Sequence, residues 1–263
     1  MTYKTIRFSK KNKIATVTLS DPKTRNAITD PLILEETKAV LRRIQDDADI
    51  SVCIITGEGK GFSSGGNVKD MLNKVNMFAG EPLELQNNYR NGIHSLSKLL
   101  YSFEIPLIAA VNGAAAGAGF DLALLCDLRI GSERASFCST FLNLAVIPGD
   151  GASWLLRKTV GAQRAAELVL TGRSVGAHEA LDMGLLLKVV EHDELLASAT
   201  EMAEMIAEKS RETLVVTKRL LRSTDTLGYE DHLNLCSANQ AMFHHAPEHQ
   251  QAINHFFEKK KKI

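Results

Sequence analysis

The chain is poor in cysteine, and no two of its cysteines lie near each other. Its 263 residues include four, which are Cys53, Cys126, Cys138 and Cys236. A CxxC pair, the usual mark of a zinc site or thiol redox motif, is absent, and no disulfide framework is expected. No run of about 18 apolar residues occurs, the length that a membrane-spanning helix needs. Residues 1–13 are charged without an apolar core, so we expect no secretory signal and a cytoplasmic protein.

Net charge is the second absence. Lys and Arg total 31, and Asp and Glu also total 31. A chain without excess positive charge offers no broad surface for nucleic acid or for a membrane, so we expect neither as a partner. Hydrophobic residues make up 44% and charged residues 24%, which is ordinary for a globular protein with a full core. The length suits one large domain or a core with a small appendage.

Strand-like and helix-like segments alternate along the first half of the chain. Strands are predicted at residues 5–8, 14–19, 52–56, 106–111 and 128–130. Helices are predicted at residues 31–44, 86–101 and 120–126, with a fraying helix from 68 to about 83. This alternation indicates an α/β fold. From Ala162 onward the pattern is helical, which favours a core over residues 1–200 and a C-terminal helical region over residues 201–263.

Two glycine-rich turns each join a predicted strand to a predicted helix. The first contains Gly65 and Gly66, and the second runs through residues 117–119. Backbone N–H groups at the start of a helix have no partner within the helix and lie at the positive end of its dipole. Two such N–H groups that converge on one point would form an oxyanion hole. Either turn by itself is better explained by a tight turn and close packing of the chain.

The two turns lie in recognisable stretches. Residues 59–71 read GKGFSSGGNVKDM, and residues 105–127 read IPLIAAVNGAAAGAGFDLALLCD. Both resemble the signatures around the two oxyanion donors of the crotonase (enoyl-CoA hydratase/isomerase) superfamily. The resemblance continues in order through residues 147–152, 160–161, 170–172 and 180–184, and covers almost the whole chain. It implies a spiral of ββα units with a mainly parallel core, an acyl-CoA substrate, and a homotrimer or homohexamer built through the C-terminal helices.

The resemblance also implies roles for particular residues. The backbone N–H groups of Gly66 and Ala118 would form the oxyanion hole. The implied coenzyme-A contacts are Arg25, Ala27, Asn67, Val68, Lys69 and Lys259, the last of them from the same or a neighbouring subunit. No metal is implied, and no cofactor apart from the coenzyme A of the substrate. The four-lysine run that contains Lys259 is equally typical of a solvated terminus.

The chain departs from the family pattern at the catalytic carboxylates. Typical hydratases of the family use two glutamates; here Asp121 stands at the first position and Phe141 at the second. Nine residues beyond Phe141 lies Asp150, in a loop where some branches of the family carry their catalytic acid. We therefore expect Asp150 to be the general acid/base and Asp121 to assist or orient it. Phe141 and Trp154 are expected to wall an apolar acyl pocket.

One proton-carrying carboxylate is enough to move a double bond, whereas hydration also needs a deprotonated water. The sequence therefore slightly favours enoyl-CoA isomerisation. Hydration by Asp121 and Asp150, carbon–carbon bond hydrolysis and non-catalytic acyl-CoA binding stay open as alternatives. Residues 61–65 also match the GxSxG motif of serine hydrolases. However, four residues, 57–60, separate the predicted strand from the start of that motif, which argues against a nucleophile elbow.

Overall fold

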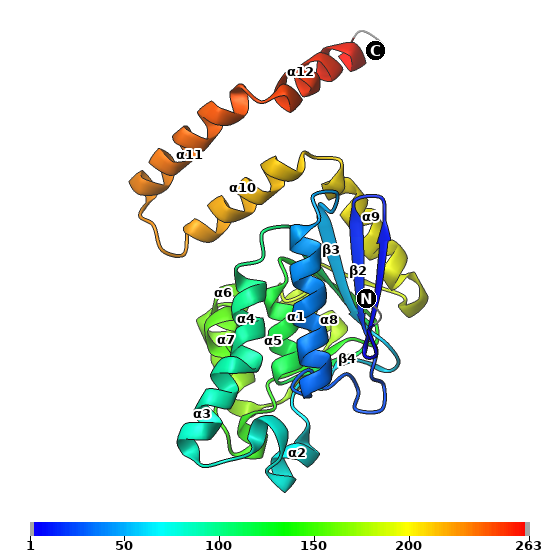
Figure 1. The fold of residues 1–263 in the computed structure, drawn as a ribbon, viewed down its shortest axis with the longest axis vertical. Helices are drawn as coiled ribbons and strands as arrows, with labels where there is room; N and C mark the ends of the chain where they lie inside the picture. The colour runs from blue at the N-terminus through cyan, green and yellow to red at the C-terminus, as the bar shows by residue number, and fades with distance from the viewer. Residues whose placement is uncertain (1–2, 261–263) are drawn as a thin grey trace.

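The fold is built on two sheets, one large and one small (Figure 1). The structure is a computed structural model that describes residues 3–260. In that part of the chain the larger sheet has six strands, in the order β1 (Ile6–Lys11), β2 (Ile14–Leu19), β3 (Val52–Gly57), β5 (Leu107–Val111), β7 (Leu128–Ser132) and β10 (Lys188–Val190). The β1–β2 hairpin is antiparallel, as predicted, and every other neighbouring pair in this sheet is parallel.

The smaller sheet repeats the order of the larger one. Its strands are β4 (Gly61–Ser63), β6 (Ala114–Ala116), β8 (Ser136–Cys138) and β9 (Ser174–Gly176). Each of β4, β6 and β8 directly follows β3, β5 and β7 of the larger sheet, and these three pair in parallel. Helix α2 (Val68–Asn73) follows β4, and α5 (Ala118–Leu125) follows β6. This is the predicted spiral of ββα units.

The helices cover both faces of the larger sheet. Helix α1 (Pro31–Asp46) begins at Asp30, whose side chain accepts a hydrogen bond from the N–H of Leu32. On the opposite side, α9 (Leu195–Ala207) packs on β3, β5 and β7 through a separate apolar cluster. All eight residues of α5 are buried, so this helix runs through the core rather than over its surface.

The helix predicted over residues 86–101 is in fact two helices. Helix α3 (Pro82–Asn91) and helix α4 (Ile93–Tyr101) meet at Gly92, whose φ of −84° and ψ of −114° end the first helix. A side chain on residue 92 would lie 2.6 Å from the carbonyl oxygen of Asn88, so only glycine allows this turn. Side chains from both helices lie close to Asp150: Tyr89 of α3, and His94 and Ser97 of α4.

The prediction that the chain is purely helical after Ala162 was wrong. Strands β9 and β10 lie there, between α7 (Ala162–Thr171), α8 (Ala177–Asp182) and α9. Helix α6 (Ala152–Val160) and the short strands β4, β6 and β8 were also not predicted. Each missed strand has only three residues, too few to show the alternating pattern by which strands are recognised.

The last helices extend away from the two sheets (Figure 1). They are α10 (Arg211–Ser223), α11 (Tyr229–His244) and α12 (Pro247–Lys260). Helix α10 is tied to the core by the buried ammonium of Lys218, which lies 2.6 Å from Asp127 and 2.7 Å from the carbonyl oxygen of Ile105. Helix α11 has no buried residue. Among residues 3–260, no helix combines the length and the apolar character needed to span a bilayer.

Candidate active site

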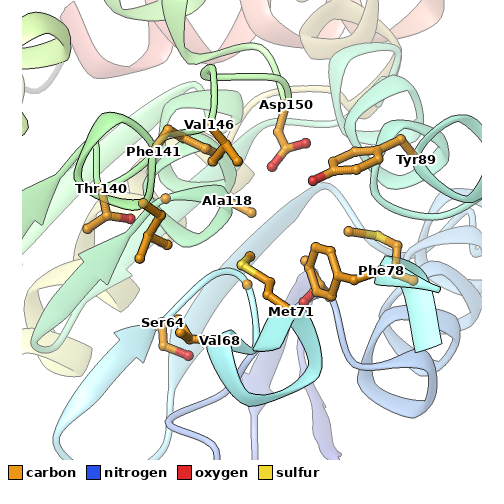
Figure 2. Close-up of a pocket in the computed structure, with 15 residues that line it drawn as sticks. Ser64, Val68, Met71, Phe78, Tyr89, Ala118, Thr140, Phe141, Val146 and Asp150 are labelled. Carbon is orange, nitrogen blue, oxygen red and sulfur yellow. The ribbon is translucent and has the colours of Figure 1, made fainter. Parts of the chain in front are cut away.

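A pocket opens where the two glycine-rich turns meet (Figure 2). Its walls come from α2, the 3₁₀ turn Asn76–Phe78, α3, the start of α5 and the loop after β8. The lining residues are Thr29, Ser64, Gly66, Val68, Met71, Met77, Phe78, Tyr89, Gly117, Ala118, Thr140, Phe141, Leu144, Val146 and Asp150. Apolar and aromatic side chains dominate this lining, and Asp150 is its only carboxylate among the described residues.

Gly65 brings the two turns into contact. A Cβ on residue 65 would lie 2.3 Å from the carbonyl oxygen of Ala116 and 2.7 Å from the amide nitrogen of Ala118. Its φ of +76° is also unfavourable for other residues. Within residues 3–260, no acceptor takes a hydrogen bond from the N–H of Gly66 or of Ala118. Both residues line the pocket, so the structure brings together the two predicted oxyanion donors.

The loop that contains Arg25 holds the first turn in place. Arg25 and Asn26 both have a φ of +58°, an uncommon conformation for non-glycine residues. The fully buried amide of Asn26 donates to the carbonyl oxygens of Gly61 and Phe62. Ala27, next in the chain, is 1% exposed. Arg25 and Ala27 therefore lie beside the oxyanion turn, although neither lines the pocket.

The serine of the GxSxG motif is occupied by this same loop. Ser63 is fully buried, and its hydroxyl donates to the carbonyl oxygen of Asn26 at 2.7 Å. It does not line the pocket. A serine held in this way is not a nucleophile, which argues against the serine hydrolase alternative.

Helix α2 begins directly after Gly66. The side-chain oxygen of Asn67 caps this helix by accepting a hydrogen bond from the N–H of Lys69 at 3.1 Å. The backbone N–H of Asn67 donates to the hydroxyl oxygen of Thr29. Val68 is half exposed and lines the pocket. Of these three predicted coenzyme-A contacts, Val68 lines the pocket, and Asn67 and Lys69 are its neighbours in the chain. Lys259 belongs to α12, but its side chain lies outside the described residues.

Asp150 projects into the pocket from the loop before α6 (Figure 2). Its side chain is only 5% exposed, and its Oδ1 has no hydrogen-bond partner among the described residues. Burial raises the pKa of Asp150 to about 6, although His94 lowers it in part. An acid/base group with a pKa near neutrality can both accept and return a proton at physiological pH.

Asp121 lies behind the pocket, on the buried helix α5. It is 1% exposed and does not line the pocket. Burial raises its pKa well above the usual value, and the negative charge of Asp150 raises it further. The N–H of Ala152 offsets part of this rise, although no described donor completes a hydrogen bond of good geometry to either oxygen. Burial and the charge of Asp150 thus both favour the protonated form of Asp121, so Asp121 gives up its proton less readily than an ordinary aspartate.

Of the two aromatic residues predicted to wall the pocket, Phe141 lines it and Trp154 does not. Phe141 lines the pocket near Val146 (Figure 2), and a Cβ on Gly117 would be 3.8 Å from its ring. Trp154 does not line the pocket. It is 46% exposed on α6, with its ring against Tyr101 and the ammonium of Lys158 3.6 Å above it.

Sequence reasoning missed two titratable residues near Asp150. Tyr89 of α3 lines the pocket and faces Asp150 (Figure 2), and burial together with the charge of Asp150 raises its pKa. His94 of α4 lies with its Nε2 3.9 Å from Oδ1 of Asp150. About 60 residues separate them from Asp150, and no motif in the sequence links them to it.

Comparison with known proteins agrees with this geometry. Residues 9–262 match the family model described as enoyl-CoA hydratase/isomerase. The chain belongs to this family. A probable mitochondrial enoyl-CoA hydratase of Dictyostelium discoideum is 37% identical over 258 residues, which span 95% of this chain and 87% of the relative. The 2,3-dehydroadipyl-CoA hydratase of Escherichia coli is 33% identical over 222 residues, or 84% of this chain and 83% of the relative.

Solved structures of the enoyl-CoA hydratase/isomerase family share the fold. The enoyl-CoA hydratase of Bacillus anthracis superposes with a TM-score of 0.91 at 28% sequence identity, covering 97% of each chain. An enoyl-CoA hydratase from Polaromonas sp. JS666 has a TM-score of 0.89 at 29% identity, again covering 97% of each chain. These comparisons establish that the chain has the crotonase-like fold and that it is an enzyme of this family, which acts on acyl-CoA.

Proposed function

We propose that this enzyme moves the double bond of an enoyl-CoA thioester, with Asp150 as the group that carries the proton. One observation supports this most directly: Asp150 is the only carboxylate, among the described residues, that lines the pocket. A second carboxylate facing the substrate is missing because Phe141 stands where the family pattern has a glutamate. The pocket therefore suits a reaction that needs one proton-carrying group and no activated water.

The proposed reaction begins with the thioester carbonyl oxygen accepting from the N–H groups of Gly66 and Ala118. The ionised Asp150 removes a proton from one carbon, and the electron pair passes through the conjugated system to the carbonyl oxygen. The two N–H groups and the positive end of α5 stabilise the dienolate. Asp150 then returns the proton to another carbon, so the double bond moves and the carboxylate is restored.

Asp121 assists in this scheme without touching the substrate. Burial and the charge of Asp150 raise its pKa, and we infer that Asp121 keeps its proton in the working enzyme, so that it adds no second negative charge beside Asp150 and leaves that carboxylate free to take the proton. Two ionised carboxylates so close together would oppose each other. Val68 and its neighbours at the pocket rim, with Arg25, Ala27 and Lys259, are proposed to contact the coenzyme A.

Hydration is the second candidate. It is supported by the electrostatic coupling of Asp121 and Asp150, which resembles a carboxylate pair able to hold a water, and by the hydratase names of the relatives described above. In this scheme Asp150 would take a proton from water and pass it to the substrate carbon, while Asp121, which does not line the pocket, would act on Asp150 through its charge.

A homotrimer or homohexamer is also proposed, with residues 201–263 forming the contacts. Helices α10 to α12 carry exposed apolar side chains, which are Leu221, Leu227, Tyr229, Leu233, Leu235, Met242, Ile253, Phe256 and Phe257. Exposed apolar area on this scale is typical of an interaction surface. The expected cytoplasmic setting, and the need for no cofactor beyond the coenzyme A of the substrate, stay predictions.

Mass spectrometry in heavy-oxygen water separates the candidates. Purified enzyme is incubated with trans-2- and trans-3-enoyl-CoA, and each product is weighed and its double bond located. Movement of the double bond without uptake of labelled oxygen supports isomerisation, and uptake of one labelled water establishes hydration instead. If neither occurs, both candidates fail, and carbon–carbon hydrolysis or simple binding becomes the better explanation. Asp150→Asn serves as the control that contamination does not cause the activity.

A further inference from the structure

Helix α4 holds the loop that carries Asp150. The Nε2 of His94 lies 2.9 Å from the carbonyl oxygen of Gly149, and the hydroxyl of Ser97 donates to the carbonyl oxygen of Asp150 at 3.4 Å. His94 and Ser97 are three residues apart, so both lie on one face of the helix. Two successive carbonyl groups of the loop are therefore bound by one helix face.

The bond to Gly149 fixes the protonation of one ring nitrogen. A carbonyl oxygen only accepts, so the Nε2 of His94 carries a proton in this arrangement. The ring is then either neutral, with its proton on Nε2, or positively charged with both nitrogens protonated.

The same nitrogen lies close to the carboxylate of Asp150. The distance from Nε2 to Oδ1 is 3.9 Å, within reach of an ion pair but too long for a hydrogen bond. Among residues 3–260, His94 is the only basic side chain paired with Asp150. Its side chain is 33% exposed, whereas that of Asp150 is 5% exposed. The imidazole ring therefore lies between the buried carboxylate and the solvent-exposed surface.

We propose that His94 is a positioning residue for Asp150, which anchors the Gly149–Asp150 loop and sets through its own charge whether Asp150 is ionised. This role matters for catalysis only if Asp150 carries the proton, as the proposed function states. A protonated ring stabilises the carboxylate that removes the substrate proton. The other titratable groups close to Asp150 are Asp121 of α5 and Tyr89 of α3. Neither can carry a positive charge, so neither stabilises the ionised carboxylate of Asp150 as a protonated His94 would.

Two variants separate the anchoring contact from the charge. His94→Gln keeps an amide N–H at a similar reach, which preserves a donor for Gly149, but removes the charge. His94→Leu removes both. Ser97→Ala is the matched control, since it deletes the other contact between α4 and this loop without changing any charge.

The measurement is a titration of the Asp150 carboxyl group by ¹³C NMR in the free, full-length enzyme. The resonance is assigned by its loss in Asp150→Asn. In both His94 variants the midpoint is expected to rise by roughly one pH unit, and in Ser97→Ala it is expected to stay unchanged. An unchanged midpoint in folded His94→Gln, or an equal shift in Ser97→Ala, overturns the proposal. If His94→Leu does not fold, His94→Gln alone decides.

Kinetics of the same variants test the catalytic meaning. In the plot of kcat against pH, the acidic limb is expected to shift to higher pH by the same amount as the NMR midpoint, while KM changes less than twofold. A change in KM with an unmoved acidic limb would mean a merely structural role and overturn the proposal. If the wild-type enzyme shows no turnover but the NMR shift occurs, the proposed function fails while the control of Asp150 by His94 stands.

Discussion

Gly65 packs against Ala118 so closely that a Cβ on residue 65 would lie 2.7 Å from the amide nitrogen of Ala118. This contact joins two turns that are about 50 residues apart in the chain. It sets the spacing between the N–H groups of Gly66 and Ala118. The proposed oxyanion hole therefore depends on a glycine that is not itself a proposed donor.

We predict that Gly65→Ala loses most turnover. The added methyl group would push the two turns apart, and loss of one oxyanion donor costs about 10²–10³ in kcat. Steady-state kinetics and thermal unfolding measure the effect. Gly176→Ala is the control, because Gly176 has no atom near its Cβ position and an ordinary φ of −78°. Near-normal kcat in folded Gly65→Ala would contradict the proposed hole.

The two aspartates are expected to respond differently to substitution by asparagine. Asp150→Asn should lower kcat by about 10²–10⁴, because an amide cannot carry the proton. Asp121→Asn should retain activity within a few-fold, since a neutral amide resembles the protonated carboxyl group predicted there. Calorimetry with a non-reactive acyl-CoA should show that both variants still bind. A severe loss in Asp121→Asn would instead favour the hydratase scheme with two acting carboxylates.

The raised pKa of Asp150 predicts opposite effects of pH on activity and on stability. Activity should fall below about pH 6, because the carboxylate must be ionised to take a proton. The folded protein holds the Asp150 proton more tightly than the unfolded chain does. The contribution of this group to stability is thus complete below the unfolded pKa, and is lost as the pH rises through about 6.

Replacing Asp150 should therefore stabilise the fold at high pH. Asp150→Asn is expected to increase the free energy of unfolding at pH 8 by roughly 3 kcal/mol, with little change at pH 4. Urea denaturation at the two pH values measures the difference. Equal effects of Asp150→Asn at both pH values would show that burial does not raise this pKa.

Restoring a carboxylate at position 141 should add water chemistry. Phe141→Glu places a second carboxylate in the pocket wall, where it can orient a water toward the substrate. We expect measurable uptake of heavy oxygen in the product, above that of the wild-type enzyme, at some cost in stability from burying a charge. Phe141→Leu is the control for the altered shape. No gain of oxygen uptake in folded Phe141→Glu would mean that Asp150 and the new group do not share a water.

The sequence by itself determined the features that depend on local backbone geometry. The turns at Gly65 and Gly117 need φ values of +76° and +49°, which glycine readily adopts, so their positions are visible in the residues. The order of strand, turn and helix around them was also predictable. The short strands were not, since three-residue segments such as β6 show no alternation and gain their hydrogen bonds only by pairing with distant strands.

Only the tertiary structure decided how the surroundings of the two aspartates differ. The sequence predicted Asp150 as the acid/base and Asp121 as its assistant, but the residues next to them do not show how deeply either carboxyl group is buried. Their difference comes from packing: Asp121 is enclosed within α5, while Asp150 faces the pocket beside His94 of α4. Desolvation and charge act through space, so the pKa of each group depends on side chains far away in the chain. For the same reason Trp154, four residues beyond Asp150, lies outside the pocket on the surface of α6.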